Sequence, residues 1–211
     1  GGLKGTVVNY VVRHVKHLVP AFELPGAVRF NEALSRGRHL PWSAPTVSPD
    51  DIAVLQYTGG TTGVSKGAVL LHRNLVANLL QSEAWYQPAL AKIPAGEQIM
   101  TVCALPLYHI FALTLCLLAV RWGSHMTLIP NPRDIGKFVE VLKQRPFHML
   151  PGVNTLFNAL LQHPDLAKVD FSPVKVSLGG GMAVQKAVAD KWKQVTGSTL
   201  VEAYGLSETS P

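Results

Sequence analysis

One short segment of the chain gathers glycines, hydroxyl side chains and a lysine. Its residues are Tyr57, Thr58, Gly59, Gly60, Thr61, Thr62, Gly63, Val64, Ser65, Lys66, Gly67 and Ala68. Glycines let the backbone turn its N–H groups towards an anion, while the hydroxyls and the lysine add donors and positive charge. The composition predicts a loop that binds a polyphosphate. A plain hairpin loop is the alternative, but flexibility alone does not explain four hydroxyls and a lysine among four glycines.

The residue order in this segment separates it from two common nucleotide-binding motifs. A Walker loop requires Gly-Lys-Ser/Thr before its helix, whereas Ser65, Lys66 and Gly67 stand in the reverse order. The Gly-x-Gly-x-x-Gly fingerprint of dinucleotide-binding folds is absent from the segment as well. A phosphate-loop NTPase is therefore disfavoured.

A second polar segment, VEAYGLSET, follows the last apolar run of the chain. Tyr204 offers a flat apolar face to a base, and Gly205 follows it in the turn. Ser207 and Thr209 can donate hydrogen bonds to phosphate, and Glu208 can ligate Mg²⁺ through oxygen. The segment predicts a nucleotide and Mg²⁺ site, with an ordinary exposed turn as the alternative, because such short motifs recur by chance.

Two further segments contain residues that could contact a ligand. Gly180 and Gly181, within Ser177–Met182, would let a planar ligand approach bare backbone, although a glycine-rich turn between strand and helix fits equally well. His109, within Leu105–Phe111, stands among aromatic residues. It is interpreted either as a satisfied core histidine or as the centre of a substrate gate.

The composition limits the class of protein. The chain has 211 residues, of which 47% are hydrophobic and 15% charged, as is typical of a soluble globular protein. Its two cysteines match no zinc or redox spacing and indicate a reduced, cytosolic protein. The apolar stretch Met100–Val120 is interrupted at Pro106, Tyr108 and His109, which leaves too short a run to cross a bilayer. Lysines and arginines do not cluster among aromatic residues, so no nucleic-acid partner is predicted.

The first 48 residues are predicted to form a basic helical arm and a linker. They carry six cations and two anions, so +4 of the chain's net charge of +6 lies here. Apolar residues recur at helical spacing over residues 6–19, and a second short helix is expected over Ala27–Ser35, before a proline-rich linker. The arm is interpreted either as a surface helix packed on another part of the full protein, or as a basic amphipathic helix touching anionic lipid.

From residue 49 to residue 211 the chain alternates between strand-like and helix-like patterns. The expected strands are Ile52–Tyr57, Gln98–Leu105, Met126–Ile129, His148–Leu150, Val174–Leu178 and Leu200–Ala203. The expected helices are Asn74–Tyr86, Ile110–Arg121, Asp134–Gln144, Asn154–Gln162 and Val184–Thr196. This alternation predicts an α/β fold with a largely parallel sheet flanked by helices. Since ligands bind beyond the carboxyl ends of parallel strands, we expect the four segments to meet there.

In their order along the chain, the four segments resemble the motif series of the acyl-CoA synthetase or adenylate-forming superfamily. Outside the motifs, four stretches are similar to bacterial long-chain-fatty-acid–CoA ligases: Leu105–Leu113, Asn131–Ile135, Gly152–Leu161 and Gly179–Val184. The resemblance covers residues 3–211, with the arm as its least diagnostic part. It implies an ATP-binding core within the large N-terminal domain of such an enzyme. The start at Gly1 without a Met and the end at Pro211 are expected of a fragment.

The resemblance implies how the nucleotide would be held. Residues 57–68, with Lys66 as a catalytic residue, would bind the ATP phosphates. Gly180 and Gly181 would lie along adenine, with Tyr204 on its other side.

The resemblance also implies the groups near the reacting atoms. Ser207 would contact the α-phosphate, Glu208 would ligate Mg²⁺, and His109 would sit near the acyl carboxylate. Ser207 stands where the family commonly has Thr, and it keeps the hydroxyl. Ala183 and Val184 stand where the family often has a Pro, a departure that we expect to be tolerated.

The implied activity has two halves. The carboxylate of a long-chain fatty acid attacks the α-phosphate of ATP and releases pyrophosphate, and the thiol of coenzyme A then displaces AMP. The ribose-binding aspartate, the domain hinge and the C-terminal lysine of such enzymes are not found in this chain, so we expect the isolated chain to lack turnover.

The resemblance further implies a cytoplasmic protein with peripheral contact at the inner face of the bacterial cytoplasmic membrane. A homodimer is left open. An adenylate-forming enzyme for another carboxylate, and a nucleotide-binding module without turnover, are the alternative functions.

Overall fold

A computed structural model describes residues 2–58 and 65–211 of the chain. The chain divides into two compact units, Gly1–Thr46 and Val47–Pro211. Each unit has its own secondary structure, and the chemistry-bearing segments all belong to the second. The second unit is called the main unit below.

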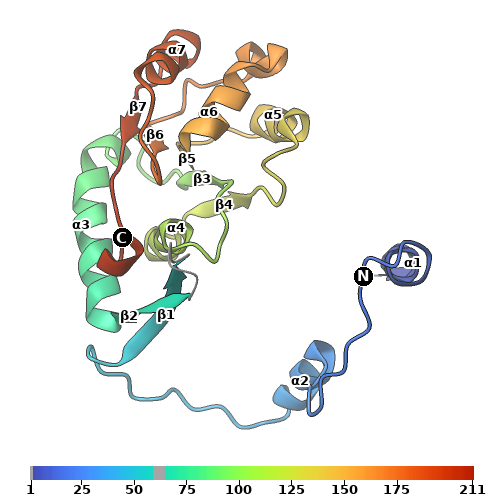
Figure 1. The fold of residues 1–211 in the computed structure, drawn as a ribbon. Helices are drawn as coiled ribbons and strands as arrows, with labels where there is room; N and C mark the ends of the chain where they lie inside the picture. Colours follow the sequence, from blue (N-terminus) through green and yellow to red (C-terminus); the bar gives the residue numbers. More distant parts are fainter. Residues whose placement is uncertain (1, 59–64) are drawn as a thin grey trace. The chain divides into compact units, whose positions relative to one another are not determined.

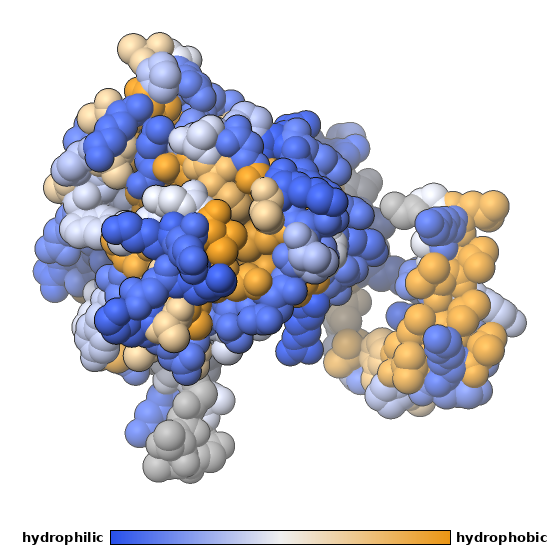
Figure 2. All heavy atoms as spheres, turned by 90° about the horizontal axis from the view of Figure 1, so that it is seen from above, coloured by the Kyte–Doolittle hydropathy of each residue, from blue (hydrophilic) through white to orange (hydrophobic). Residues whose placement is uncertain are grey.

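The first unit is an arm with little core of its own. It contains helix α1 (Gly2–Tyr10), a π-helical turn (Val11–Val15) and helix α2 (Phe30–Gly37). The predicted single helix over residues 6–19 is wrong in both bounds, because the helix starts at Gly2 and changes its hydrogen-bonding pattern after Tyr10. Large apolar side chains of the arm are exposed, and Figure 2 shows hydrophobic residues over much of the surface that it presents.

The main unit is built on a five-stranded parallel sheet (Figure 1). Its strands are β3 (Met100–Cys103), β4 (His125–Leu128), β5 (Met149–Gly152), β6 (Val176–Gly179) and β7 (Leu200–Glu202). They lie in the order β4-β3-β5-β6-β7, and all neighbours pair in parallel. This topology requires a crossover after each strand, which the intervening segments supply. The predicted α/β class with a largely parallel sheet is confirmed.

Helices cover both faces of this sheet. They are α3 (His72–Leu90), α4 (Ile110–Trp122), α5 (Ile135–Gln144), α6 (Asn154–Leu161) and α7 (Lys186–Thr196). Helices α5, α6 and α7 pack on one face, while α3 and α4 pack on the other (Figure 1). Two short 3-10 helices, Pro164–Lys168 and Ser207–Thr209, complete the unit. Among the described residues, no helix combines the length and the apolar character that spanning a membrane requires.

The first two strands form a separate antiparallel hairpin. Strand β1 (Ile52–Thr58) pairs with β2 (Lys66–Leu71), and Thr58 lies opposite Lys66 in the register. The sequence predicted β1 as a member of the parallel sheet, with the phosphate loop at its tip, and missed β2. That prediction is wrong, because β1 takes its described hydrogen bonds from the chain that returns after the glycine-rich segment.

Candidate functional site

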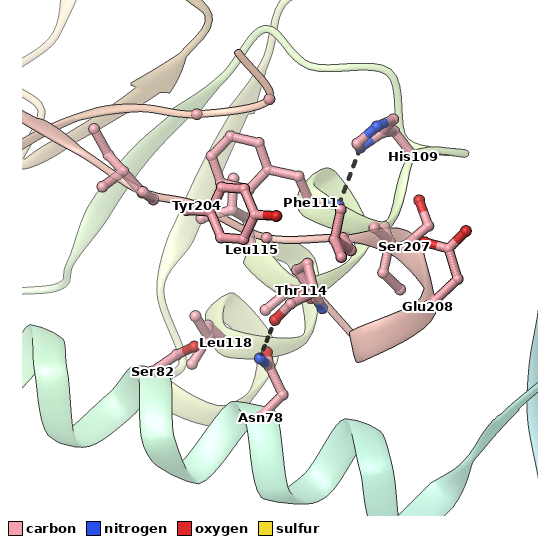
Figure 3. Close-up of a pocket in the computed structure, with 18 of the residues that line it drawn as sticks. Asn78, Ser82, His109, Phe111, Thr114, Leu115, Leu118, Tyr204, Ser207 and Glu208 are labelled. Atoms are coloured by element: carbon pink, nitrogen blue, oxygen red, sulfur yellow. Dashed lines mark hydrogen bonds between the residues drawn. The ribbon is translucent and has the colours of Figure 1, made fainter. Parts of the chain in front are cut away.

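The polar segments meet around a cavity of about 390 Å³ in the main unit (Figure 3). Its walls come from five places: the turn after β6, the segment after β7, one side of α4, one side of α3 and Thr58 at the end of β1. The first two walls lie beyond the carboxyl ends of parallel strands, where ligands bind in sheets of this kind. Residues of three of the four segments, those that contain Gly180, Tyr204 and His109, line the cavity, whereas the segment 57–68 contributes only Thr58 among its described residues and follows a strand outside the parallel sheet.

Packing or backbone conformation explains why glycine is needed at each of the positions Gly179, Gly180 and Gly181. A Cβ atom at Gly179 would clash with Val184 Cγ2, and one at Gly180 would lie 3.0 Å from Phe111 Cε1. Gly181 has a φ of +76°, which favours glycine. Both Gly180 and Gly181 line the cavity. Packing against neighbouring side chains therefore accounts for the first two glycines, and backbone conformation accounts for the third.

Tyr204 presents the largest open aromatic surface at the site. Its side chain is 89% exposed and lines the cavity beside Gly205, as Figure 3 shows for the ring. Ser207 and Glu208 follow in the 3-10 helix and also line the cavity. Thr209 is not among the described residues that line it, and its Oγ1 donates to Leu206 O at 2.9 Å. The structure thus brings four of the five predicted residues of this segment to the cavity.

His109 is the N-cap residue of helix α4 and lines the cavity (Figure 3). Its Nδ1 accepts a hydrogen bond from the backbone N–H of Phe111 at 3.2 Å, so the ring caps the helix. A neutral ring whose Nδ1 accepts carries its proton on Nε2. The side chain is exposed, so the interpretation of His109 as a satisfied core histidine is wrong.

The predicted phosphate-binding segment is only partly covered by the structure. Gly59, Gly60, Thr61, Thr62, Gly63 and Val64 lie outside the described residues. Thr58 lines the cavity, and its Oγ1 donates to Lys66 O at 3.4 Å. Tyr57, Ser65, Lys66, Gly67 and Ala68 are described, but they are not among the described residues that line the cavity. The hairpin therefore brings one end of the segment to the site.

Sequence reasoning missed the wall that α3 contributes. Asn78, Ser82 and Tyr86 line the cavity at intervals of four residues, which places them along one side of the helix. This spacing of polar side chains is the feature of the sequence that could have indicated a helix face lining a site. On the facing helix α4, Thr114 and Leu115 line the cavity.

Helix α6 is not among the described elements that line the cavity. The apolar residues of Val153–Leu161 could serve equally to line an acyl tunnel or as ordinary core. Leu156, Phe157 and Leu160 belong to the core against α5 and α7. Of the two readings, the structure therefore supports ordinary core, because α6 packs on the face of the sheet away from α3 and α4.

Packing and hydrogen bonds hold the α3 wall in place. Burial raises the pKa of Tyr86, whose ring packs edge-on against Trp122 with centroids 5.7 Å apart. Glu83 accepts hydrogen bonds from Arg121 at 2.6 Å and from Trp122 Nε1 at 3.1 Å, which ties α3 to the end of α4. The bond from Arg121 lowers the pKa of Glu83. Asn78 donates to Pro211 O at 2.6 Å, while its buried Oδ1 has no partner among the described residues.

The carboxylate available for a metal ion is that of Glu208. The described residues contain no group of three or more His, Cys, Asp or Glu side chains that could hold a metal ion. Mg²⁺ usually binds through one or two carboxylates together with the phosphates of a nucleotide, and it keeps several waters. A single carboxylate beside the Ser207 hydroxyl, at a cavity with room for a nucleotide's phosphates, fits that mode of binding.

Comparison with known proteins identifies the family. The family model described as AMP-binding enzyme matches residues 10–211. The chain belongs to this family. It is 53% identical over 209 residues to the long-chain-fatty-acid–CoA ligase of Yersinia pestis, and 39% identical over 171 residues to that of Bacillus subtilis. These matches cover 99% and 79% of the chain, but only 36% and 29% of the two relatives.

Two solved structures share the fold. The ATP-bound MatB of Rhodopseudomonas palustris is 26% identical, with a TM-score of 0.70, and the match covers 85% of this chain and 34% of MatB. The inhibitor-bound N-terminal domain of FACL13 from Mycobacterium tuberculosis is 20% identical, with a TM-score of 0.71, over 95% of this chain and 50% of that one. At this low identity the second likeness concerns the fold alone.

Proposed function

We propose that the chain is the ATP-binding core of a long-chain-fatty-acid–CoA ligase. The observation that carries the proposal is the cavity, at which a glycine turn, an open tyrosine ring, a hydroxyl, a carboxylate and a histidine converge. Family membership and the likeness to long-chain-fatty-acid–CoA ligases support the reaction. The chain spans about 36% of the Yersinia pestis relative, so the activity is proposed for the longer protein.

In the proposed complex the nucleotide base occupies the slot between the β6 turn and Tyr204. Bare backbone at Gly180 and Gly181 forms one side of the slot, and the tyrosine ring offers the other. Residues 57–68 and Ser207 bind the phosphates, with the Lys66 ammonium contributing charge from the start of β2. Hydrogen-bond donors and a cation set in place before the reaction stabilise the charge that develops at the α-phosphorus.

His109 holds the carboxylate of the acyl substrate. With its Nδ1 engaged as the helix cap, the ring donates from Nε2, which suits a carboxylate acceptor. The acyl chain extends along the apolar side of α4, where Leu115 and Leu118 line the cavity. The carboxylate oxygen attacks the α-phosphorus, pyrophosphate leaves, and the sulfur of coenzyme A later attacks the acyl carbon as AMP leaves.

Glu208 is proposed to ligate Mg²⁺ together with the phosphates. When bound, the ion neutralises phosphate charge and acts as a Lewis acid. Glu208 lies one residue from Ser207, so the segment after β7 holds both the hydroxyl and the carboxylate near the same phosphates.

The test of the proposed function is trapping of the acyl-adenylate with hydroxylamine in the full-length protein. Carboxylates from about two to about eighteen carbons are supplied with ATP and Mg²⁺, a range chosen to span the apolar burial that chain length adds per CH₂. We expect acyl-hydroxamate and equimolar pyrophosphate, with the highest kcat/KM at the long end. Maximal activity with a short or aromatic carboxylate would instead indicate an adenylate-forming enzyme for another substrate. ATP binding without any hydroxamate would leave only a nucleotide-binding module.

We further propose that the isolated chain lacks turnover. The chain spans about 36% of the Yersinia pestis relative, and the rest of the longer protein is expected to complete the adenylation site. The isolated chain should therefore release no pyrophosphate from oleate and ATP. Release at the rate of the full-length protein would contradict this.

A peripheral membrane role is proposed for the arm. The basic residues of Gly1–Thr46 and the exposed apolar side chains of α1 suit an anionic lipid surface, which would bring a cytoplasmic enzyme to the inner face of the membrane. Replacing Arg13 and Lys16 by Glu in the full-length protein should reduce sedimentation with anionic liposomes. Unchanged sedimentation would favour the alternative that the arm packs on another part of the protein. Light scattering of the same samples would show whether the protein is a homodimer.

A further inference from the structure

A carboxylate from the neighbouring strand closes the glycine turn after β6. Glu202 is the last residue of β7, and its Oε1 accepts a hydrogen bond from the backbone N–H of Val184 at 2.9 Å. Gly179, the last residue of β6, is the register partner of Glu202. The contact therefore joins the end of β7 to Val184, which lies five residues after the end of β6.

The same turn is fixed at three other points. Gly180 N–H donates to Gly152 O at 3.0 Å, and Ala203 N–H donates to Gly179 O at 2.8 Å. At the far end, Asn154 Oδ1 accepts from Gln185 N–H at 3.0 Å, one residue after the bond to Glu202. These contacts come from strands or from a buried asparagine, whereas Glu202 supplies the exposed side-chain contact.

Val184 also covers the turn with its side chain. Its Cγ2 atom fills the place that a Cβ on Gly179 would need. A shift of Val184 would therefore change the packing against Gly179 and move the intervening residues, which include Gly180 and Gly181 at the cavity wall. Glu202 itself is not among the described residues that line the cavity.

We infer that Glu202 is a positioning residue for nucleotide binding, acting through Val184 on the turn that carries Gly180 and Gly181. The identity of the ligand, ATP, rests on the proposed function. The charge of Glu202 works against this role, since a carboxylate repels a polyphosphate. Removing the charge of Glu202 should therefore strengthen ATP binding, whereas removing its hydrogen bond to Val184 should weaken it. The opposite signs allow the two effects to be separated.

Two variants of the full-length protein test the inference. Glu202→Gln and Glu202→Ala both remove one negative charge, but only Glu202→Ala removes the acceptor for Val184 N–H. Loss of one such hydrogen bond corresponds to about a tenfold change in an equilibrium constant. We therefore expect Glu202→Ala to raise the Kd for ATP about tenfold, and Glu202→Gln to stay within about twofold of the wild type. Glu140→Ala, an exposed carboxylate on α5, is the control for charge alone.

Two further readouts separate positioning from a general loss of structure. Hydrogen exchange of a peptide containing Val184 should be faster in Glu202→Ala and unchanged in Glu202→Gln. The KM for the fatty acid, and kcat at saturating ATP, should stay within about twofold of the wild type in both variants, because only a weak ground-state contact is lost.

Three outcomes would overturn the inference. They are equal ATP affinity of wild type and Glu202→Ala, tighter binding by both variants, and a parallel loss of every kinetic parameter and of Tm in Glu202→Ala. ATP affinity is measured without a carboxylate substrate. If the wild-type protein bound ATP but formed no acyl-adenylate, the proposed activity would fail while the Glu202 comparison would still be decided by the affinities.

Discussion

The two faces of the parallel sheet differ in how their apolar residues are used. Under α5, α6 and α7, four aromatic rings pack edge-to-face, with centroids between 4.9 and 5.8 Å apart. Trp192 lies at the middle of this group and is fully buried. Under α3 and α4 the buried clusters are smaller, and polar side chains such as Asn78 and Thr114 stand beside a cavity. One face is a closed core, while the other leaves room for a ligand.

The difference shows where stability and function are separated in this fold. Helices on the closed face can be held by dense packing, because the residues there have no ligand to admit. Helices on the cavity face are held by smaller buried clusters together with contacts at their edges, such as the bonds from Arg121 and Trp122 to Glu83. Substitutions on the two faces should therefore change different measured quantities.

The largest effect on stability is expected on the closed face. Trp192→Ala removes a side chain that touches Phe157 and Phe171 and donates from Nε1 to Ser177 Oγ. We expect the free energy of unfolding to fall by about 3–5 kcal/mol, as in other large aromatic-to-alanine changes in cores. Urea unfolding measures this. Trp85→Ala, at a ring that is 56% exposed, is the matched control and should cost less than about 1 kcal/mol.

A substitution on the cavity face should change the kinetics more than the stability. Ser82→Phe directs a ring from α3 into the cavity, so we expect kcat/KM for the carboxylate to fall at least about tenfold, as a blocked site lowers transition-state binding. The free energy of unfolding should change by less than about 1 kcal/mol, because no core contact is removed. If Ser82→Phe left the kinetics unchanged while destabilising the fold, the contrast between the faces would be wrong.

A smaller effect is expected at the open ring of Tyr204. Tyr204→Ala removes the proposed stacking surface for adenine, and stacking of aromatic pairs contributes about 0.5–1.5 kcal/mol beyond area burial. The KM for ATP should therefore rise by up to about tenfold, while Tm stays constant because the ring is 89% exposed. Tyr204→Phe keeps the face and should behave like the wild type. An equal rise in KM in both variants would point to the hydroxyl instead.

The smallest effect on stability is expected at the hydrogen bond from Arg121 of α4 to Glu83 of α3. The hydrogen bond from Arg121 lowers the pKa of Glu83 from its ordinary value of 4.5. The pKa of Glu83 is lower in the folded state than in the unfolded state. Ionised Glu83 therefore stabilises the fold fully at pH values above the unfolded-state pKa, and this stabilisation is lost as the pH falls through the folded-state pKa. The stability gap between wild type and Glu83→Gln should be constant near neutral pH and close in acid. A gap that did not change with pH would show that the charge of Glu83 is irrelevant.

Much of the fold could be predicted from the sequence because each strand of the parallel sheet is a short apolar run between helical patterns. Helix α4 was expected at Ile110–Arg121 and is found at Ile110–Trp122, since His109 and Gly123 mark its ends locally. The hairpin could not be predicted in the same way. The apolar residues Val69–Leu71 give the same local signal whether they join a large sheet or pair back onto β1, and only tertiary contacts decide.

The site was predictable where a motif carried its own chemistry, as at Tyr204 and Glu208. It was not predictable where ordinary residues acquire a role by position. Ser82 has no unusual neighbours in the sequence, and it lines the cavity only because α3 crosses beside α4. Glu202 was part of a recognised motif, but its bond to Val184 depends on two strands ending side by side.

The four tryptophans of the chain occupy very different surroundings. Trp42 and Trp85 are 83% and 56% exposed, whereas Trp192 is enclosed by aromatic rings. Iodide in solution can collide with the first two rings and quench their emission, but it cannot reach the third. The residual, blue-shifted fluorescence would then come from the enclosed indole together with the half-buried Trp122 on the other face of the sheet, so it follows the interior of the protein separately from its surface.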